Sequence, residues 1–225
     1  MNLNDFSDMY PLPKANAHPN IYKPDENIYV IKNFSTPEER EFCMTFVDKA
    51  NEAEWNKDQR EWWNNKILFL GENQEFLSVS NGILDRIRLL LEEEYNWVVG
   101  GMSSIHRMRV GEGMFLHADN PTEEMGKNNF VQYGMVLYHN DFNGGDLVYP
   151  ELGIQYHPEA GDLVIHPGIS RYKHEVSPVT GPGNRYVSTT FAFDPEIKKL
   201  RDLKMVYQDE NGLYLEKDPN HSWQK

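Results

Sequence analysis

The second half of the chain consists of short runs of β-branched and aromatic residues separated by glycine-containing turns. The turns are marked by Gly111-Glu112-Gly113, Asn143-Gly144-Gly145 and Gly181-Pro182-Gly183-Asn184. Many short strands at regular spacing are typical of a β-sandwich or barrel, such as a double-sheet jelly roll. We therefore expect strands near residues 97–110, 114–118, 130–139, 146–149, 153–156, 162–166, 172–176 and 185–193.

Two helices are predicted before this region. After a strand-like run at 28–34, Thr36 can cap a helix, Pro37 suits its first turn and Glu39 completes a capping box. An apolar stripe at helical spacing predicts a second helix over about 78–95. The expected fold class is mostly β with flanking helices: a double-stranded β-helix (jelly roll, cupin-like) with N-terminal helices packed on one sheet.

The two ends of the chain differ from the middle. Four prolines among residues 1–25 predict an extended N-terminal arm. Residues 26–195 then form the main domain. Residues 196–225 are expected to be an extension that packs on the same domain, with a short helix near 195–204 and a hairpin around Asn211-Gly212.

Charge and cysteine content narrow the functional classes. The 22 basic and 35 acidic residues give a net charge of −13, which argues against binding to nucleic acid or an anionic membrane. The single cysteine, Cys43, excludes an intramolecular disulfide and any multi-cysteine metal site. The sequence also lacks a run of about 18 apolar residues and a signal-like N-terminus, so we expect a cytoplasmic protein.

His117 and Asp119 form the most informative pair of polar residues. In a strand, residues i and i+2 face the same side, so this imidazole and this carboxylate project together. They could supply two ligands of a facial triad for non-haem Fe(II). Alternatively, the two side chains form a local hydrogen-bonded pair before the turn that Asp119-Asn120-Pro121 favours.

A triad needs a second histidine from a distant strand. His174 is the favoured third ligand, and His166 is its rival, although the position of His166 at a strand end before a turn favours a structural role. A metal enzyme of another kind could use His106, His139 or His166 instead.

Arg185 begins a strong strand, and alternation places it on the face of Phe191 and Phe193. If that face is interior, the buried arginine requires an anion, and a carboxylate bound by both guanidinium nitrogens is the natural partner. Asp146 or Asp162 of the protein itself could also serve.

Together these residues resemble the Fe(II)- and 2-oxoglutarate-dependent dioxygenases, in particular their prolyl 4-hydroxylase-like branch. The resemblance covers about residues 26–195. Four segments carry it in order: the strand and helix of 28–46, the run from His117 to Pro121, the run from Tyr138 to Leu147, and the block from Gly161 through His174 to Arg185. Many prolyl hydroxylases have a tyrosine two residues before the glycine of the loop that precedes the first metal motif. In this chain the stretch is Met108-Arg109-Val110-Gly111, so Arg109 or a neighbour replaces that tyrosine.

The resemblance implies that His117, Asp119 and His174 bind iron and act in catalysis. It implies that Arg185 binds the distal carboxylate of 2-oxoglutarate, with Tyr138 donating a hydrogen bond to it and Thr189 adding a hydroxyl. The implied cofactors are Fe(II), with 2-oxoglutarate and O2 as cosubstrates and ascorbate as an accessory reductant.

The implied reaction is hydroxylation of a C–H bond, on a prolyl or other peptidyl residue, with release of succinate and CO2. A protein or peptide substrate is favoured over a small molecule, and neither nucleic acid nor a membrane is an expected partner. Three alternatives stay open: a non-catalytic jelly-roll binding module, a cupin-type enzyme with another metal, and a small-molecule hydroxylase.

Overall fold

The computed structural model describes residues 12–57, 65–91, 98–119, 131–193, 206–209 and 212–215. Within these ranges, nine strands form one large sheet, with β5 (Val98–Val99) paired to β15. The spatial order of its other strands is β1 (Ile21–Asp25), β2 (Ile28–Ile31), β12 (Leu163–Pro167), β8 (Val131–Tyr138), β15 (Arg185–Phe193), β6 (Ser104–Met108), β4 (Lys66–Phe69) and β3 (Trp55–Lys57).

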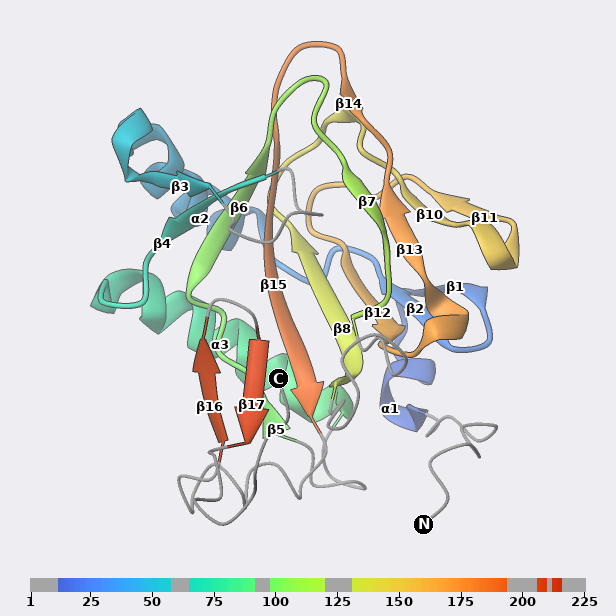
Figure 1. The fold of residues 1–225 in the computed structure, drawn as a ribbon. Coiled ribbons are helices and arrows are strands. Elements are labelled where there is room, and N and C mark those ends of the chain that lie inside the picture. The colour runs from blue at the N-terminus through green and yellow to red at the C-terminus, as the bar shows by residue number, and fades with distance from the viewer. Residues whose placement is uncertain are drawn as a thin grey trace, which may run out of the picture.

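A smaller sheet faces the large one. Its order is β11 (Ile154–Tyr156), β10 (Leu147–Tyr149), β13 (His174–Val176) and β7 (Met114–His117). Side chains from both sheets meet in one buried cluster, in which Tyr138, Val164 and Val187 of the large sheet pack with Leu147 and Val176 of the small one. This two-layer β architecture, visible in Figure 1, confirms the expected jelly roll.

Two helices precede the main strands, as expected. Helix α2 (Pro37–Lys49) has the expected capping box between Thr36 and Glu39. Helix α3 (Gln74–Leu91) covers the outer face of the large sheet, where Leu84 and Ile87 pack in one cluster with Tyr133 and Met135. Short helical turns complete the fold: α1 (Pro13–Asn16), η1 (Glu52–Glu54), η2 (Pro150–Leu152) and η3 (Ser170–Tyr172).

The N-terminal segment differs from the expected extended arm. Residues 13–16 are helical, and β1 pairs with β2 in the large sheet. Leu12 and Ala15 are buried in the cluster around α3. Apolar side chains at a few positions therefore anchor this segment despite its prolines, while residues 1–11 lie outside the described residues.

Other helices and strands also differ from the predicted ones. The second helix begins at Gln74 and is described to Leu91, and β3 pairs with β4 in a region where the sequence predicted no strand. Two further short strands, β9 (Asn143–Gly144) and β14 (Val179–Thr180), form a separate pair. The tail hairpin is present as β16 (Val206–Asp209) and β17 (Gly212–Leu215), whereas the helix expected near 195–204 lies outside the described residues.

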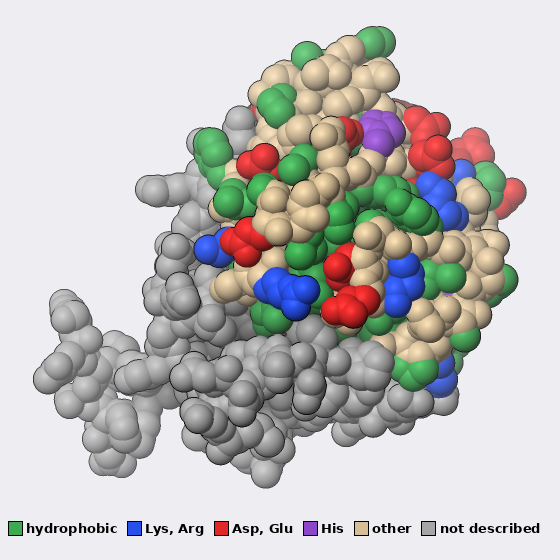
Figure 2. Space-filling model, turned by 90° about the vertical axis from the view of Figure 1, so that its right-hand side faces the viewer, with side chains coloured by type: hydrophobic (Ala, Val, Ile, Leu, Met, Phe, Trp, Pro, Cys, Tyr) green, Lys and Arg blue, Asp and Glu red, His purple; other side chains and the backbone are tan. Residues whose placement is uncertain are grey.

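Charged side chains of both signs share the surface seen in Figure 2, where basic side chains lie among acidic ones. Lys32 is one of the bases that pair with acids, since its Nζ lies 2.6 Å from Glu159 and 2.8 Å from Asp162. None of the described helices is sufficiently long and apolar to span a membrane.

Asp162 lies directly before β12, and its carboxylate forms hydrogen bonds with neighbouring segments. The side chain is fully buried, and its Oδ2 accepts hydrogen bonds from Lys32, from Tyr156 at 2.7 Å and from the backbone of Glu159 at 2.9 Å. Replacing Asp162 by alanine should lower the free energy of unfolding by about 3 kcal/mol, because three donors lose a buried acceptor. Chemical denaturation measures this change.

Asp85→Ala is the matched control, because Asp85 forms an exposed i,i+3 pair with Arg88. Its removal should change the free energy of unfolding by less than about 0.5 kcal/mol. An Asp162→Ala loss as small as that of the control would contradict the role assigned to this carboxylate.

Candidate metal and anion site

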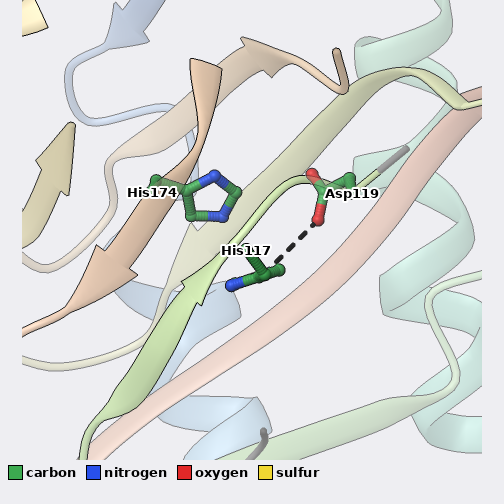
Figure 3. Close-up of side chains that lie close together, drawn as sticks. All are labelled: His117, Asp119 and His174. Carbon is green, nitrogen blue, oxygen red and sulfur yellow. Dashed lines mark ion pairs between the residues drawn. The ribbon is translucent and has the colours of Figure 1, made fainter. Parts of the chain in front are cut away.

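The ends of β7 and β13 bring two histidines together. His117 and His174 are direct partners in the antiparallel ladder, and their ring centroids lie 4.4 Å apart. Asp119 follows two residues after His117, and its Oδ1 lies 3.8 Å from His117 Nε2. The three residues offer ligand atoms that all lie within 4.8 Å of one another. Figure 3 shows the three side chains close together, with an ion pair between His117 and Asp119.

Backbone hydrogen bonds orient both rings. His117 Nδ1 lies 2.8 Å from the carbonyl oxygen of Phe115, and His174 Nδ1 lies 3.1 Å from that of Tyr172. A carbonyl can only accept, so each Nδ1 carries the proton and each Nε2 keeps its lone pair for a metal. Burial strongly lowers the pKa of His174, and the nearby His166 and His117 lower it further. The neutral ring is the form that binds a cation.

A glycine makes room for Asp119. Gly134 lies on β8, and a Cβ built there would overlap Asp119 Oδ2 and lie 3.1 Å from the ring of His166. The carboxylate therefore occupies space that any other residue at position 134 would fill. The inner face of the large sheet is shaped to accept this ligand.

His166, the rival third ligand, also lies at this centre. Its Nε2 is 3.7 Å from Asp119 Oδ2, and its ring packs edge-on against His174 at a centroid distance of 4.3 Å. Burial lowers the pKa of His166. The other two histidines that another metal enzyme might use lie elsewhere: His139 bonds Ser188, and His106 contacts Asn65 and Thr189.

The second part of the site is Arg185 at the start of β15. The side chain is only 2% exposed, so its charge is inside the protein as expected. One terminal nitrogen lies 3.2 Å from the Tyr138 hydroxyl, and the other lies 3.5 Å from the sulfur of Met108. The rings of Tyr138 and Phe142 lie 5.0 and 5.6 Å from the guanidinium carbon.

Arg185 has no carboxylate within ion-pairing distance among the described residues, and its Nε has no hydrogen-bond partner there. The two candidate acids are engaged elsewhere: Asp162 with Lys32, and Asp146 with His157 at 2.6 Å. A buried guanidinium without an anion is costly, so this position fits an anionic ligand.

Tyr138 and Thr189, both expected to bind the 2-oxoglutarate carboxylate, have different neighbours in the structure. The Tyr138 hydroxyl accepts a hydrogen bond from Arg185, and burial raises the pKa of that hydroxyl. The Thr189 hydroxyl lies 3.3 Å from His106 Nε2, and no hydrogen bond joins it to Arg185. Of the residues at the position of the family's tyrosine, Arg109 pairs with Glu52, whereas its neighbour Met108 contacts Arg185.

The sequence analysis did not single out Tyr149, and it favoured a structural role for His166 while keeping it as a rival third ligand. Tyr149 is buried beside His174 and His166, at ring distances of 5.6 and 5.9 Å, and its hydroxyl has no hydrogen-bond partner among the described residues. The alternation of the short strand Leu147-Val148-Tyr149 could have indicated its inward direction.

The donor set fits the metal centre that the sequence predicted. Two imidazole nitrogens and one carboxylate oxygen, gathered on one side, are the ligand type of non-haem Fe(II) sites and leave positions open for other ligands. Arg185, which has no carboxylate partner in the part of the chain that the structure describes, adds a position for a carboxylate in the same interior.

Comparisons with known proteins agree with this chemistry. A family model described as the 2OG-Fe(II) oxygenase superfamily matches residues 103–193. No curated protein sequence matches the chain.

Similar solved structures include three prolyl hydroxylases. A viral collagen prolyl hydroxylase from Paramecium Bursaria Chlorella virus-1, in complex with 2OG, has 12% identity and a TM-score of 0.58, covering 75% of this chain and 96% of that one. A Trichoplax adhaerens prolyl hydroxylase, in complex with a hypoxia inducible factor peptide fragment, has 20% identity and a TM-score of 0.59, with 84% and 90% covered. A Pseudomonas putida prolyl-4-hydroxylase has 16% identity and a TM-score of 0.55, with 82% and 97% covered. At these identities the likeness establishes the fold.

Because Gly134 leaves space for Asp119, a side chain at this position should disturb metal binding. Gly134→Ala should weaken the binding of Mn(II), used as an air-stable substitute for Fe(II), by about tenfold or more, because the new methyl group displaces Asp119. Isothermal titration calorimetry measures the affinity, and circular dichroism checks the fold.

Gly101→Ala is the control, since a Cβ built there meets no atom within 4 Å. It should bind Mn(II) like the wild type. Unchanged Mn(II) affinity in Gly134→Ala would show that Asp119 is not held where the structure places it.

Proposed function

We propose that this chain, which belongs to the 2OG-Fe(II) oxygenase superfamily, hydroxylates a C–H bond of a prolyl or other peptidyl residue. The reaction would use Fe(II), 2-oxoglutarate and O2 and release succinate and CO2. The buried Arg185, without a carboxylate partner among the described residues and in the same interior as a His-Asp-His cluster, is the observation that carries the proposal.

Each site residue has a defined task under this proposal. His117 and His174 would bind the metal through Nε2, because their Nδ1 protons are held by backbone carbonyls. Asp119 would complete the ligand set and offset part of the metal charge. Bound iron and 2-oxoglutarate would supply the oxidising power that activates O2, which protein side chains lack.

Arg185 and Tyr138 would hold the far carboxylate of 2-oxoglutarate. The guanidinium supplies charge and donors, and the Tyr138 hydroxyl can donate a second hydrogen bond. The rings of Tyr138 and Phe142 and the side chain of Val187 are buried around this position. These apolar walls exclude water and so strengthen the ion pair.

Two observations support a peptide substrate. One of the solved prolyl hydroxylases with this fold is bound to a peptide fragment. In this chain, β7 is the last strand of the small sheet, and Phe115 and Leu116, directly before His117, are 65% and 47% exposed. An extended peptide could pack against these apolar side chains while presenting one residue to the metal.

We also propose a reducing compartment such as the cytoplasm as the place of action. Fe(II) is maintained there, and the buried, unpaired Cys43 is compatible with it.

The first experiment is an anaerobic titration with Fe(II) and 2-oxoglutarate, monitored by the weak visible metal-to-ligand charge-transfer band. The wild type should develop the band only with both additions. Arg185→Met should weaken 2-oxoglutarate binding by about 30-fold or more, because the carboxylate loses its buried counter-charge. Asp119→Ala should give no band.

Arg107→Met is the matched control, because Arg107 is also buried but stacks on Trp55 and pairs with Glu52 outside the site. It should keep the wild-type affinity for 2-oxoglutarate. A folded wild type that binds metal but gives no band would favour a cupin-type enzyme with another metal. A wild type that binds neither would favour a non-catalytic module.

Substrate class is tested separately by succinate formation. Proline-containing peptides should raise the rate above that without peptide, whereas the same peptides with alanine in place of proline should not. Mass spectrometry should find a gain of one oxygen on proline. Equal stimulation by the alanine peptides would contradict the prolyl assignment, and stimulation only by small molecules would contradict the peptidyl one.

A further inference from the structure

His166 touches the candidate metal ligands and has no assigned task. We propose that His166 is a positioning residue whose Nε2–H donates a hydrogen bond to Asp119 and holds that carboxylate in its metal-binding orientation. The inference rests on the proposed function, since it requires that Asp119 binds a metal.

The two oxygens of Asp119 face different histidines. Oδ1 lies 3.8 Å from Nε2 of His117, a candidate metal ligand. Oδ2 lies 3.7 Å from Nε2 of His166. A shift of about 0.5 Å would bring the second pair within hydrogen-bond distance. Asp119 can therefore give one oxygen to the metal while the other accepts a proton from His166.

The position of the His166 ring is fixed by its surroundings. The side chain is 1% exposed, and it packs edge-on against His174 and Tyr149. Gly134 lies directly opposite it on β8, which leaves the space where the ring meets the carboxylate. Packing on these sides leaves the ring little room to turn away from Asp119.

The two ring nitrogens of His166 also favour a hydrogen bond to Asp119. Nδ1 of His166 is buried and has no hydrogen bond of normal geometry among the described residues, although the Pro167 backbone lies close enough to affect the ring. A carboxylate is a stronger acceptor than a backbone carbonyl, so a neutral ring gains by carrying its proton on Nε2, which lies on the side of Asp119. The charge-assisted bond that results is stronger than a neutral one.

A role as fourth metal ligand fits less well. The cluster in which all ligand atoms lie within 4.8 Å of one another comprises His117, Asp119 and His174, without His166. A site with two histidines and one carboxylate would leave metal positions open for other ligands, which the proposed reaction requires. A fourth protein ligand would occupy one of them.

The test compares Co(II) binding by the full chain and three variants. His166→Phe keeps a ring and removes the donor, so Co(II) affinity should fall by about 10- to 100-fold. His166→Gln places an amide nitrogen the same number of bonds from Cβ, and it should restore affinity to within about threefold of wild type. His139→Gln, at a buried histidine whose Nε2 bonds Ser188, should leave the affinity unchanged.

The visible spectrum of the Co(II) protein separates positioning from ligation. At saturating metal, His166→Phe should show the wild-type band pattern, because the same atoms bind Co(II). A changed pattern would mean that His166 is itself a ligand and would overturn the proposal. Wild-type affinity in His166→Phe, or equally weak binding by a folded His166→Gln, would also overturn it.

The outcomes distinguish this inference from the proposed function. If wild type binds Co(II) and the histidine variants behave as expected, but Fe(II) and 2-oxoglutarate give no visible band, the positioning role stands and the reaction assignment fails. If the band forms and His166→Phe binds Co(II) like wild type, the reaction assignment stands and the positioning role fails. Thermal unfolding of each variant without metal shows whether the fold is retained.

Discussion

The antiparallel pairing of β7 with β13 is the interaction on which the site depends. It places His117 directly opposite His174, so two residues separated by a long stretch of sequence become neighbours. Because strand side chains alternate, a slip of one residue would turn one histidine to the other face and separate the ligands. The pairing has an irregularity between His174 and Val176, so the His117–His174 pair is not part of a long regular ladder.

The burial of Arg185, by contrast, destabilises the folded protein. Its charge has been removed from water, and the described residues provide a hydroxyl, a thioether and aromatic faces in place of a carboxylate. Such an arrangement is costly without an anion. A carboxylate ligand that binds only the folded state would recover part of this cost and stabilise the protein by mass action. Stability and ligand binding are therefore coupled at this residue.

Local patterns predicted the features that depend on a few neighbouring residues. The period of two gave the proximity of His117 and Asp119, although Asp119 lies just beyond the end of β7, and it gave the inward direction of Arg185. Outside the site, the capping box gave the start of α2. The same patterns could not show which strands become neighbours. The approach of His166 to Asp119, the contact of Thr189 with His106 and the β3–β4 hairpin were therefore not predicted. The first two depend on pairing between strands that are far apart in the sequence.

The two histidine ligands and Arg185 come from different sheets, so the packing between the sheets affects the geometry of the site. The histidines come from the small sheet, whereas Arg185, Tyr138 and Gly134 come from the large one. A dicarboxylate that binds both ends needs a fixed separation between them. That separation is set by the apolar side chains between the layers, including Leu147 and Val164. Because protein interiors are closely packed, a change of volume there would move one layer against the other and alter the site without touching a ligand.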